Sequence, residues 1–291
     1  MIVVTTPTGS IGRQLVGRLL DSGEPVRVIA RDPSRLPARV SERAEVVQGS
    51  LLDSDVVRKA FAGADRVFLL VPPDLRAPSV EGHYLDCTRP ACAAIVAHGV
   101  RQAVGLSSMG RGIGRNGGHL SAAHAKDALI ADTGVAYRAL RPPAFMENLL
   151  WQAGSIRSGG TFSWAHPGDR VLPAVATRDI AARAAELLLD GSWTGCEGVP
   201  VVGPDTLTPD GMAEVMSEVL RRPVRYRQAP LDDYRETMIR HGASEAWAQG
   251  LADMAVAQNN GAYDEEHRAA PPAPTSFRQW CEEVLRPAVL S

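Results

Sequence analysis

The sequence predicts an α/β fold of the doubly wound Rossmann type, a parallel sheet that carries a smaller, mostly helical lobe on its substrate side. Apolar β-branched runs alternate with amphipathic runs up to Phe145, and a glycine-containing turn follows the first run. After Phe145 this rhythm changes. We therefore expect a Rossmann domain at 1–144 and 176–203, and a substrate-side lobe at 145–175 and 204–291.

The first unit is predicted to be a strand, a tight turn and a helix. Residues 2–4 are apolar, and the residues from Ile11 to Leu20 follow helical spacing. Such a turn presents backbone N–H groups at the positive end of the helix dipole, where a pyrophosphate can bind. Gly9 and Gly12 occupy the last two glycine positions of the dinucleotide fingerprint, and Thr6 stands in place of the first. The candidate cofactor contacts here are Thr6, Thr8, Gly9, Ser10, Ile11 and Gly12. The alternative is a strand–turn–helix unit without a ligand.

The end of the second strand indicates which dinucleotide is bound. Residues 25–30 predict this strand, which Arg31 follows directly, and Arg35 lies on the loop after it. An acidic residue at this place holds the ribose 2′-OH of NAD, whereas an arginine suits the 2′-phosphate of NADP. We therefore predict NADP(H). The alternative is that Asp32 binds the ribose and the two arginines are solvated surface charges.

The alternation continues along the chain. Further strands are predicted at 45–49, 66–71, 102–107 and 136–141, and helices at 54–62, 81–98 and 119–132. Pro90 is expected to kink the helix at 81–98. Ligands of parallel sheets bind at the carboxyl ends of the strands. The remaining candidate cofactor contacts are therefore Ser50, Val71, Pro72, Ser107, Pro142 and Phe145.

The lobe is less regular in sequence. A helix is predicted at 146–156, an irregular stretch runs through Trp164, and a helix at 179–189 returns to the sheet. A strand at 224–228 and a closing helix at 276–285 follow, with a surface loop at 269–274.

Composition excludes several classes of function. The 291 residues carry a net charge of −2, which gives no electrostatic case for a nucleic acid or an anionic membrane as partner. The four cysteines show no metal-ligand spacing, so we expect reduced thiols and no metal. We expect a cytoplasmic protein, because the chain starts with a strand and has no apolar stretch of membrane-spanning length. The sequence does not indicate an oligomeric state.

Five segments resemble the NmrA-like group of atypical short-chain dehydrogenases/reductases. They are Thr-Gly-Ser-Ile-Gly at 8–12, Ile-Ala-Arg-Asp-Pro at 29–33, Phe-Leu-Leu-Val-Pro-Pro at 68–73, Leu-Ser-Ser at 106–108 and Leu-Arg-Pro-Pro-Ala-Phe-Met-Glu-Asn-Leu at 140–149. The resemblance implies a Rossmann fold, NADP(H) near Gly9, Gly12 and Arg31, and a nicotinamide close to Ser107 and the turn at 142–145. The group includes quinone and imine reductases, ketone reductases of aromatic natural-product pathways, and redox sensors without catalytic activity.

The sequence departs from the Ser-Tyr-Lys triad of many short-chain dehydrogenases. Aligned by Asp127, the helix places His119 at the tyrosine position and Ala123 at the lysine position, while the serine position falls within 107–109. The usual acid, a tyrosine whose pKa is lowered by lysine, is therefore absent. His119 and Ser107 are the candidate catalytic residues, because an imidazole with a pKa near neutrality can donate a proton. His166 is a weaker candidate.

We predict an NADPH-dependent reductase of a bulky conjugated substrate, an aromatic ketone or a quinone, such as a ketoreductase of polyketide antibiotic biosynthesis. Hydride addition to a quinone, or to a ketone conjugated with phenols, yields an anion that is spread over a ring or held by an internal hydrogen bond, so water, the substrate or His119 can supply the proton. The candidate substrate contacts are Met109, Phe145, Met146, Asn148 and Trp164. They are equally the residue types of an ordinary core. The rival hypothesis is a redox sensor that binds NADP(H) without turnover and acts through a protein partner. An epimerase or dehydratase is disfavoured, because those reactions need the missing tyrosine and lysine.

Overall fold

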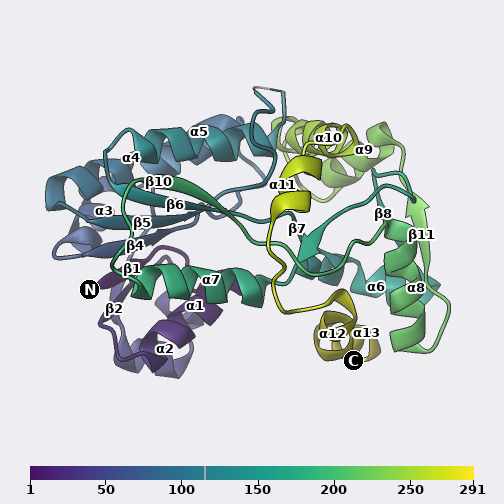
Figure 1. The fold of residues 1–291 in the computed structure, drawn as a ribbon, viewed down its shortest axis with the longest axis horizontal. Helices are drawn as coiled ribbons and strands as arrows, with labels where there is room; N and C mark the ends of the chain where they lie inside the picture. The colour runs from purple at the N-terminus through teal and green to yellow at the C-terminus, as the bar shows by residue number, and fades with distance from the viewer. Residues whose placement is uncertain (115) are drawn as a thin grey trace.

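The computed structural model describes residues 1–114 and 116–291, and a seven-stranded sheet lies at its centre (Figure 1). All neighbouring strands are parallel, in the order β10-β6-β5-β4-β1-β2-β3. The strands are β1 (Ile2–Val4), β2 (Val26–Ala30), β3 (Glu45–Gln48), β4 (Arg66–Leu69), β5 (Gln102–Leu106), β6 (Ala136–Arg141) and β10 (Cys196–Pro200). The chain runs outward from β1 to β3 and then crosses back to β4. This reversal between β1 and β4 is the place where doubly wound folds bind their ligands, and it confirms the predicted fold class.

Helices cover both faces of the sheet (Figure 1). One layer holds α1 (Ser10–Asp21), α2 (Ala38–Arg43) and α7 (Thr177–Leu189), and the other holds α3 (Ser54–Phe61), α4 (Val80–His98) and α5 (His119–Ala131). Alternate residues of β1 face opposite layers, since Ile2 and Val4 pack in the cluster with α1 and α7, whereas Val3 packs with α3 and α4. Both faces are buried, which explains the continuous apolar runs in the sequence.

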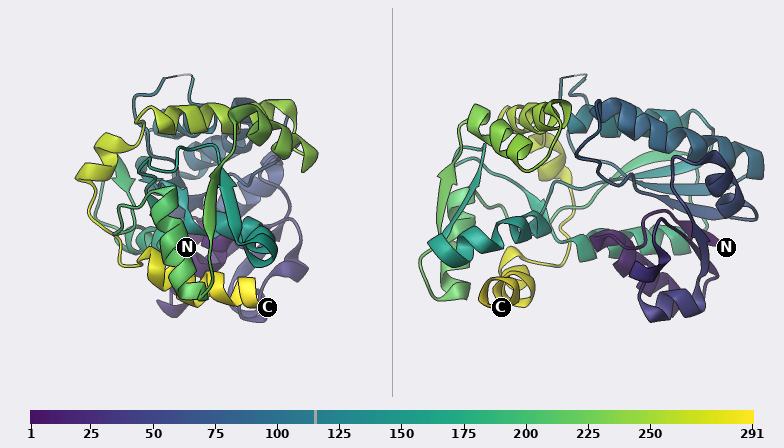
Figure 2. Two further views of the ribbon diagram at one scale, coloured as in Figure 1. Left: turned by 90° about the vertical axis from the view of Figure 1, so that its right-hand side faces the viewer. Right: turned by 180° about the vertical axis from the view of Figure 1, so that it is seen from behind.

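The remaining segments lie beyond the carboxyl edge of the sheet (Figure 2). The parallel strands β8 (Thr161–Trp164) and β11 (Arg225–Gln228) pair there beside α6 (Ala153–Gly159) and α8 (Pro209–Leu220). Their apolar cluster includes α12 (Phe277–Trp280) and α13 (Arg286–Leu290). A second group comprises α9 (Leu231–Arg240), α10 (Glu245–Asn259) and α11 (Asp264–Ala269). Trp247 and Ala248 of α10 pack on Val80 and Ala122, so this group lies against α4 and α5. The division into two domains remains a prediction.

The structure differs from the predicted elements mainly after Phe145. Residues 161–164 form β8 instead of an irregular stretch, and the pair β7 (Ala144–Phe145) and β9 (Ala174–Val175) was not predicted. The predicted helix at 146–156 begins as a 3₁₀ segment, Met146–Gln152. The closing helix contains a π-helical turn at Cys281–Leu285. The helix predicted at 81–98 is confirmed as α4, which runs from Val80 to His98 with Pro90 inside it. None of the described helices combines the length and apolarity needed to cross a membrane.

Candidate active site

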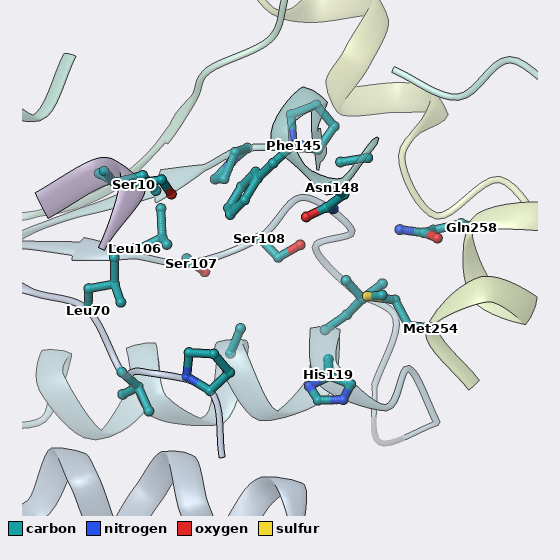
Figure 3. Close-up of a pocket in the computed structure, with 18 of the residues that line it drawn as sticks. Ser10, Leu70, Leu106, Ser107, Ser108, His119, Phe145, Asn148, Met254 and Gln258 are labelled. Carbon is teal, nitrogen blue, oxygen red and sulfur yellow. The ribbon is translucent and has the colours of Figure 1, made fainter. Parts of the chain in front are cut away.

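A cleft of about 750 Å³ opens at the carboxyl ends of β1, β4 and β5 (Figure 3). One end is lined by the first turn of α1, and the other by residues that follow β6 and by α10. The side chains between these ends are mostly apolar or aromatic. The lining of the cleft includes Thr6, Gly9, Ser10, Ile11, Arg35, Val71, Tyr84, Ser107, Ser108, His119, Pro142, Phe145, Asn148, Trp151, Trp164, His166, Tyr234, Met254, Gln258 and Tyr263.

The two glycines of the first turn differ in what surrounds them. A Cβ atom on Gly12 would lie 1.8 Å from the carbonyl oxygen of Thr6, so Gly12 allows α1 to pack against the end of β1. A Cβ atom on Gly9 would meet no protein atom closer than 3.7 Å, and Gly9 lines the cleft. The first turn of α1 contains no acidic residue, and no side chain caps it. This open, positively polarised turn fits a pyrophosphate.

Thr6 replaces the first fingerprint glycine without strain. Its backbone does not adopt a positive φ, so the turn does not require glycine there. The Thr6 hydroxyl donates to the Leu70 carbonyl at 2.8 Å, and the Thr5 hydroxyl donates to the Phe68 carbonyl at 3.1 Å. The two threonines therefore tie the end of β1 to the end of β4, across the switch point.

The loop after β2 favours an arginine contact to the nucleotide. The Asp32 carboxylate accepts hydrogen bonds from the Ser34 amide and hydroxyl, and these bonds lower the pKa of Asp32. Asp32 thus caps a 3₁₀ turn, Pro33–Arg35, and its Oδ1 atom is already engaged. Arg35 lines the cleft, whereas Arg31 is exposed beside it and does not.

The other predicted cofactor contacts divide into two groups. Ser10, Ile11, Val71, Ser107, Pro142 and Phe145 line the cleft. Thr8, Ser50 and Pro72 do not, although they lie at the same edge of the sheet. The Pro72 carbonyl accepts a hydrogen bond from His83 Nε2 at 2.8 Å, and Ser50 Oγ accepts one from the Leu52 amide at 3.2 Å. Ser50 is therefore engaged within its own loop, and the Pro72 carbonyl with α4.

Two predicted substrate contacts are buried and do not line the cleft. Met109 is 0% exposed and packs with Leu120 and Tyr263, and Met146 is 2% exposed within the cluster of the lobe. Each directly follows a residue that does line the cleft, Ser108 and Phe145 respectively. Phe145, Asn148 and Trp164 do line the cleft.

His119, one of the candidate proton donors, is largely buried at the cleft wall. The side chain lines the cleft, but it is 8% exposed and packs edge-on against Trp247 with ring centroids 4.4 Å apart. This burial lowers the pKa of His119 to about 4, so the imidazole is neutral at pH 7. Burial also lowers the pKa of His166, whose Nδ1 lies 2.7 Å from Asn259 Oδ1.

Ser107 is held as a hydrogen-bond acceptor. Its hydroxyl donates to Asp127, a carboxylate that also accepts from the Tyr137 hydroxyl at 2.6 Å and pairs with Lys126 Nζ at 3.1 Å. Lys126 is 1% exposed and donates to the Leu106 carbonyl at 2.7 Å. Because a hydroxyl has one proton, Ser107 presents only lone pairs to the cleft. In the sequence, Asp127 served only as the position by which the helix was aligned. The adjacent charges of Lys126 and Asp127 in an alanine-rich helix were a signal of the buried hydrogen-bond network around Asp127.

Several other lining residues had no recognisable signal in the sequence. They are Tyr84, Tyr234, Met254, Gln258 and Tyr263. Three of these belong to α10 and the turn after it, and no local motif distinguishes them from packing residues. Trp151 is 91% exposed at the cleft mouth.

Fold and cleft together define a dinucleotide-binding α/β protein. The chain belongs to the NmrA-like family, whose model matches residues 1–280. A (4-alkanoyl-5-oxo-2,5-dihydrofuran-3-yl)methyl phosphate reductase of Streptomyces griseus is 35% identical over 97% of each chain. An NAD(P)H azoreductase of Xenophilus azovorans is 26% identical over 87% of this chain and 86% of its own.

Solved structures agree on the fold. An NADPH-dependent quinone oxidoreductase from Escherichia coli, in complex with NADPH, superposes with a TM-score of 0.80 at 21% identity, covering 96% of this chain and 98% of that one. The Citrobacter triphenylmethane reductase in complex with NADP(H) gives a TM-score of 0.78 at 18% identity, covering 99% and 100% of the two chains.

Proposed function

We propose that this protein transfers a hydride from NADPH to a conjugated ketone or a quinone bound in the cleft. It is an NADP(H)-dependent oxidoreductase, as its family and its reductase relatives indicate. The observation that carries the proposal is one continuous cleft that joins the open first turn of α1 to the aromatic side chains Phe145 and Trp164. The name of the Streptomyces griseus relative describes an alkanoyl group on an unsaturated lactone, which is also a conjugated carbonyl compound.

The residues of the nucleotide end fit the cofactor. The free N–H groups beside Gly9 suit a pyrophosphate, and the Arg35 guanidinium suits a 2′-phosphate. The Ser107 oxygen can only accept a hydrogen bond from the cleft, so it suits an N–H group of the nicotinamide amide. NADPH, when bound, supplies the hydride. The sheet edge and the lobe then shield this end of the cleft from water.

The protonation states of His119 and Ser107 support a conjugated or aromatic substrate. His119 is neutral at pH 7, and the Ser107 proton is committed to Asp127. Neither group is a strong acid for the carbonyl oxygen. A substrate whose reduced form spreads its negative charge over a ring needs less acid catalysis, and water can protonate it afterwards. This favours conjugated and aromatic substrates over simple aliphatic ketones.

Oxidation of NADPH, followed by absorbance, tests the proposal. The panel should contain quinones, polycyclic aromatic ketones and an alkanoyl butenolide, with NADH as the competing cofactor. We expect turnover with NADPH. We also expect Arg35→Ala to raise the KM for NADPH but not for NADH, while the matched variant Arg31→Ala, outside the cleft lining, has the smaller effect. Tight NADPH binding without oxidation of any panel member would refute the proposal and favour the sensor.

A further inference from the structure

A chain of three side chains enters the substrate end of the cleft beside Ser107. Gln258 Nε2 of α10 donates to the Tyr263 hydroxyl oxygen at 2.9 Å, and this hydroxyl lies 3.2 Å from Ser108 Oγ. Gln258 and Tyr263 are 6% and 3% exposed, whereas Ser108 is half-buried in the cleft. Figure 3 shows Ser108 between Ser107 and Gln258, with its hydroxyl in the open space of the cleft.

One direction of this chain leaves a hydrogen-bond donor in the cleft, and the contact between the Tyr263 and Ser108 hydroxyls allows it, since either hydroxyl can be the donor there. An amide nitrogen can only donate, so the Tyr263 oxygen is the acceptor in its bond with Gln258. The Tyr263 proton is then available for Ser108 Oγ. Ser108 Oγ has no other partner among the described residues, so its own proton is free to point into the cleft. Ser107 and Ser108 are adjacent, yet they present opposite polarity: Ser107 accepts and Ser108 donates.

One further contact and the burial of Tyr263 support this arrangement. His124 Nε2 donates to the Ser108 carbonyl at 3.1 Å, which fixes the backbone of the serine to α5. Burial raises the pKa of Tyr263, so its hydroxyl keeps the proton that the chain requires. Buried hydrogen-bond chains of this kind strengthen their terminal donor, because each bond polarises the next.

We propose that the chain from Gln258 through Tyr263 makes Ser108 the hydrogen-bond donor to the carbonyl oxygen of the substrate. Ser108 is then a catalytic residue, and Tyr263 and Gln258 are positioning residues. Tyr263 and Gln258, which lie in the segment after β11, support a hydrogen-bond donor to the substrate. The helix at 119–131 does not provide one, because it lacks the tyrosine and lysine of the triad. Ser108 donates a hydrogen bond to the oxygen as it gains negative charge, and the proton that completes the alcohol comes from water. The inference rests on the proposed reductase function.

The test compares two substrates that differ in the basicity of the oxygen. The reduced form of a polycyclic ketone carries its charge on one oxygen, whereas a quinone spreads the charge over the ring. We expect Ser108→Ala to lower kcat for the ketone by about 100-fold and to change kcat for the quinone far less. Tyr263→Phe should lower kcat for the ketone by about 10-fold, which corresponds to one hydrogen bond. KM and the Kd for NADPH should stay near the wild-type values in both variants.

Two further variants serve as controls. Ser108→Thr keeps the hydroxyl and should restore the wild-type ratio of ketone to quinone turnover. Tyr226→Phe removes another tyrosine hydroxyl, one that donates to the carbonyls of Trp164 and His166 and lies outside the cleft lining, and it should leave that ratio unchanged.

The possible results separate the role of Ser108, the role of Tyr263 and the reductase function from one another. Equal losses on both substrates, or none, in Ser108→Ala would overturn the role of Ser108 while the reductase function stands. A loss in Ser108→Ala without one in Tyr263→Phe would overturn the orienting chain. A wild-type protein that reduces neither substrate would overturn the proposed function and this inference with it.

Discussion

Replacing Gly12 by alanine should destabilise the protein, whereas the same change at Gly9 should weaken NADPH binding and leave stability intact. At Gly12 the new Cβ atom would lie 1.8 Å from the Thr6 carbonyl oxygen, against a minimum of 3.0 Å in real structures, so α1 and the end of β1 must separate by 1.2 Å (3.0 − 1.8). The obstructing atoms are backbone, and the Thr6 hydroxyl ties them to Leu70. We therefore expect a loss of about 3 kcal/mol, the upper end for overpacking, and a Tm lower by about 6–12 °C.

Gly9 has a backbone conformation that alanine adopts freely, with φ −76° and ψ 170°. Its nearest protein atom is 3.7 Å from the added methyl, so Gly9→Ala should be neutral or stabilising by about 0.5 kcal/mol. The methyl group would instead occupy the space beside the first turn of α1 that a pyrophosphate needs. We expect the Kd for NADPH to rise by at least about 10-fold, a cost of roughly 1.4 kcal/mol.

Thermal and urea unfolding, followed by circular dichroism, and fluorescence titration with NADPH measure both effects. The two variants are matched controls for each other, since each adds one methyl group to the same turn. Equal destabilisation by both, or wild-type NADPH affinity in Gly9→Ala, would refute the reasoning.

Two further predictions concern stability. His119→Phe should reduce the acid sensitivity of the fold: the folded-state pKa of about 4 lies below the unfolded value of 6.5, so the contribution of this group is complete above pH 6.5 and is lost as the pH falls towards 4. The loss in full is about 3 kcal/mol, and urea unfolding at pH 7 and pH 4.5 should show a smaller decline in the variant; parallel declines would contradict the assignment. Glu147→Gln should cost about 1–2 kcal/mol and spare kcat, because the carboxylate accepts from the Thr177 amide at 3.0 Å at the start of α7 and from Trp280 Nε1 at 3.3 Å. Unchanged urea unfolding would show that these bonds contribute nothing.

The sheet was predictable because its signals are local. β1 opens the chain, each strand from β2 to β6 follows a helix, and the predicted ranges agree with the structure to within two residues at either end. β10 was not predicted as a strand, since Cys-Glu-Gly-Val-Pro carries glycine and proline and lies at the sheet edge. β8 was also missed, because its four residues depend on pairing with β11, more than sixty positions away.

The two ends of the cleft differed in how well the sequence predicted them. The nucleotide end lies on the turn after β1 and the loop after β2, so Gly9, Ser10 and Arg35 could be named from local pattern. The substrate end is assembled from the ends of β5 and β6, from α5 and from α10. Which side of the chain a residue such as Met109 faces depends on the path of the whole turn, and the pKa of His119 depends on Trp247, which lies far away in sequence.

The packing of α12 and α13 also sets an order on folding during synthesis. Trp280 and Leu285 are 0% exposed and fill the same apolar cluster as Phe162 of β8, which leaves the ribosome more than a hundred residues earlier. The strands from β1 to β5 can pair during synthesis before the last helices exist, because all their partners lie within residues 2–141. The support behind the substrate wall of the cleft, by contrast, waits for the last helices. A nascent chain can therefore acquire its nucleotide turn well before it has a finished pocket for the molecule to be reduced.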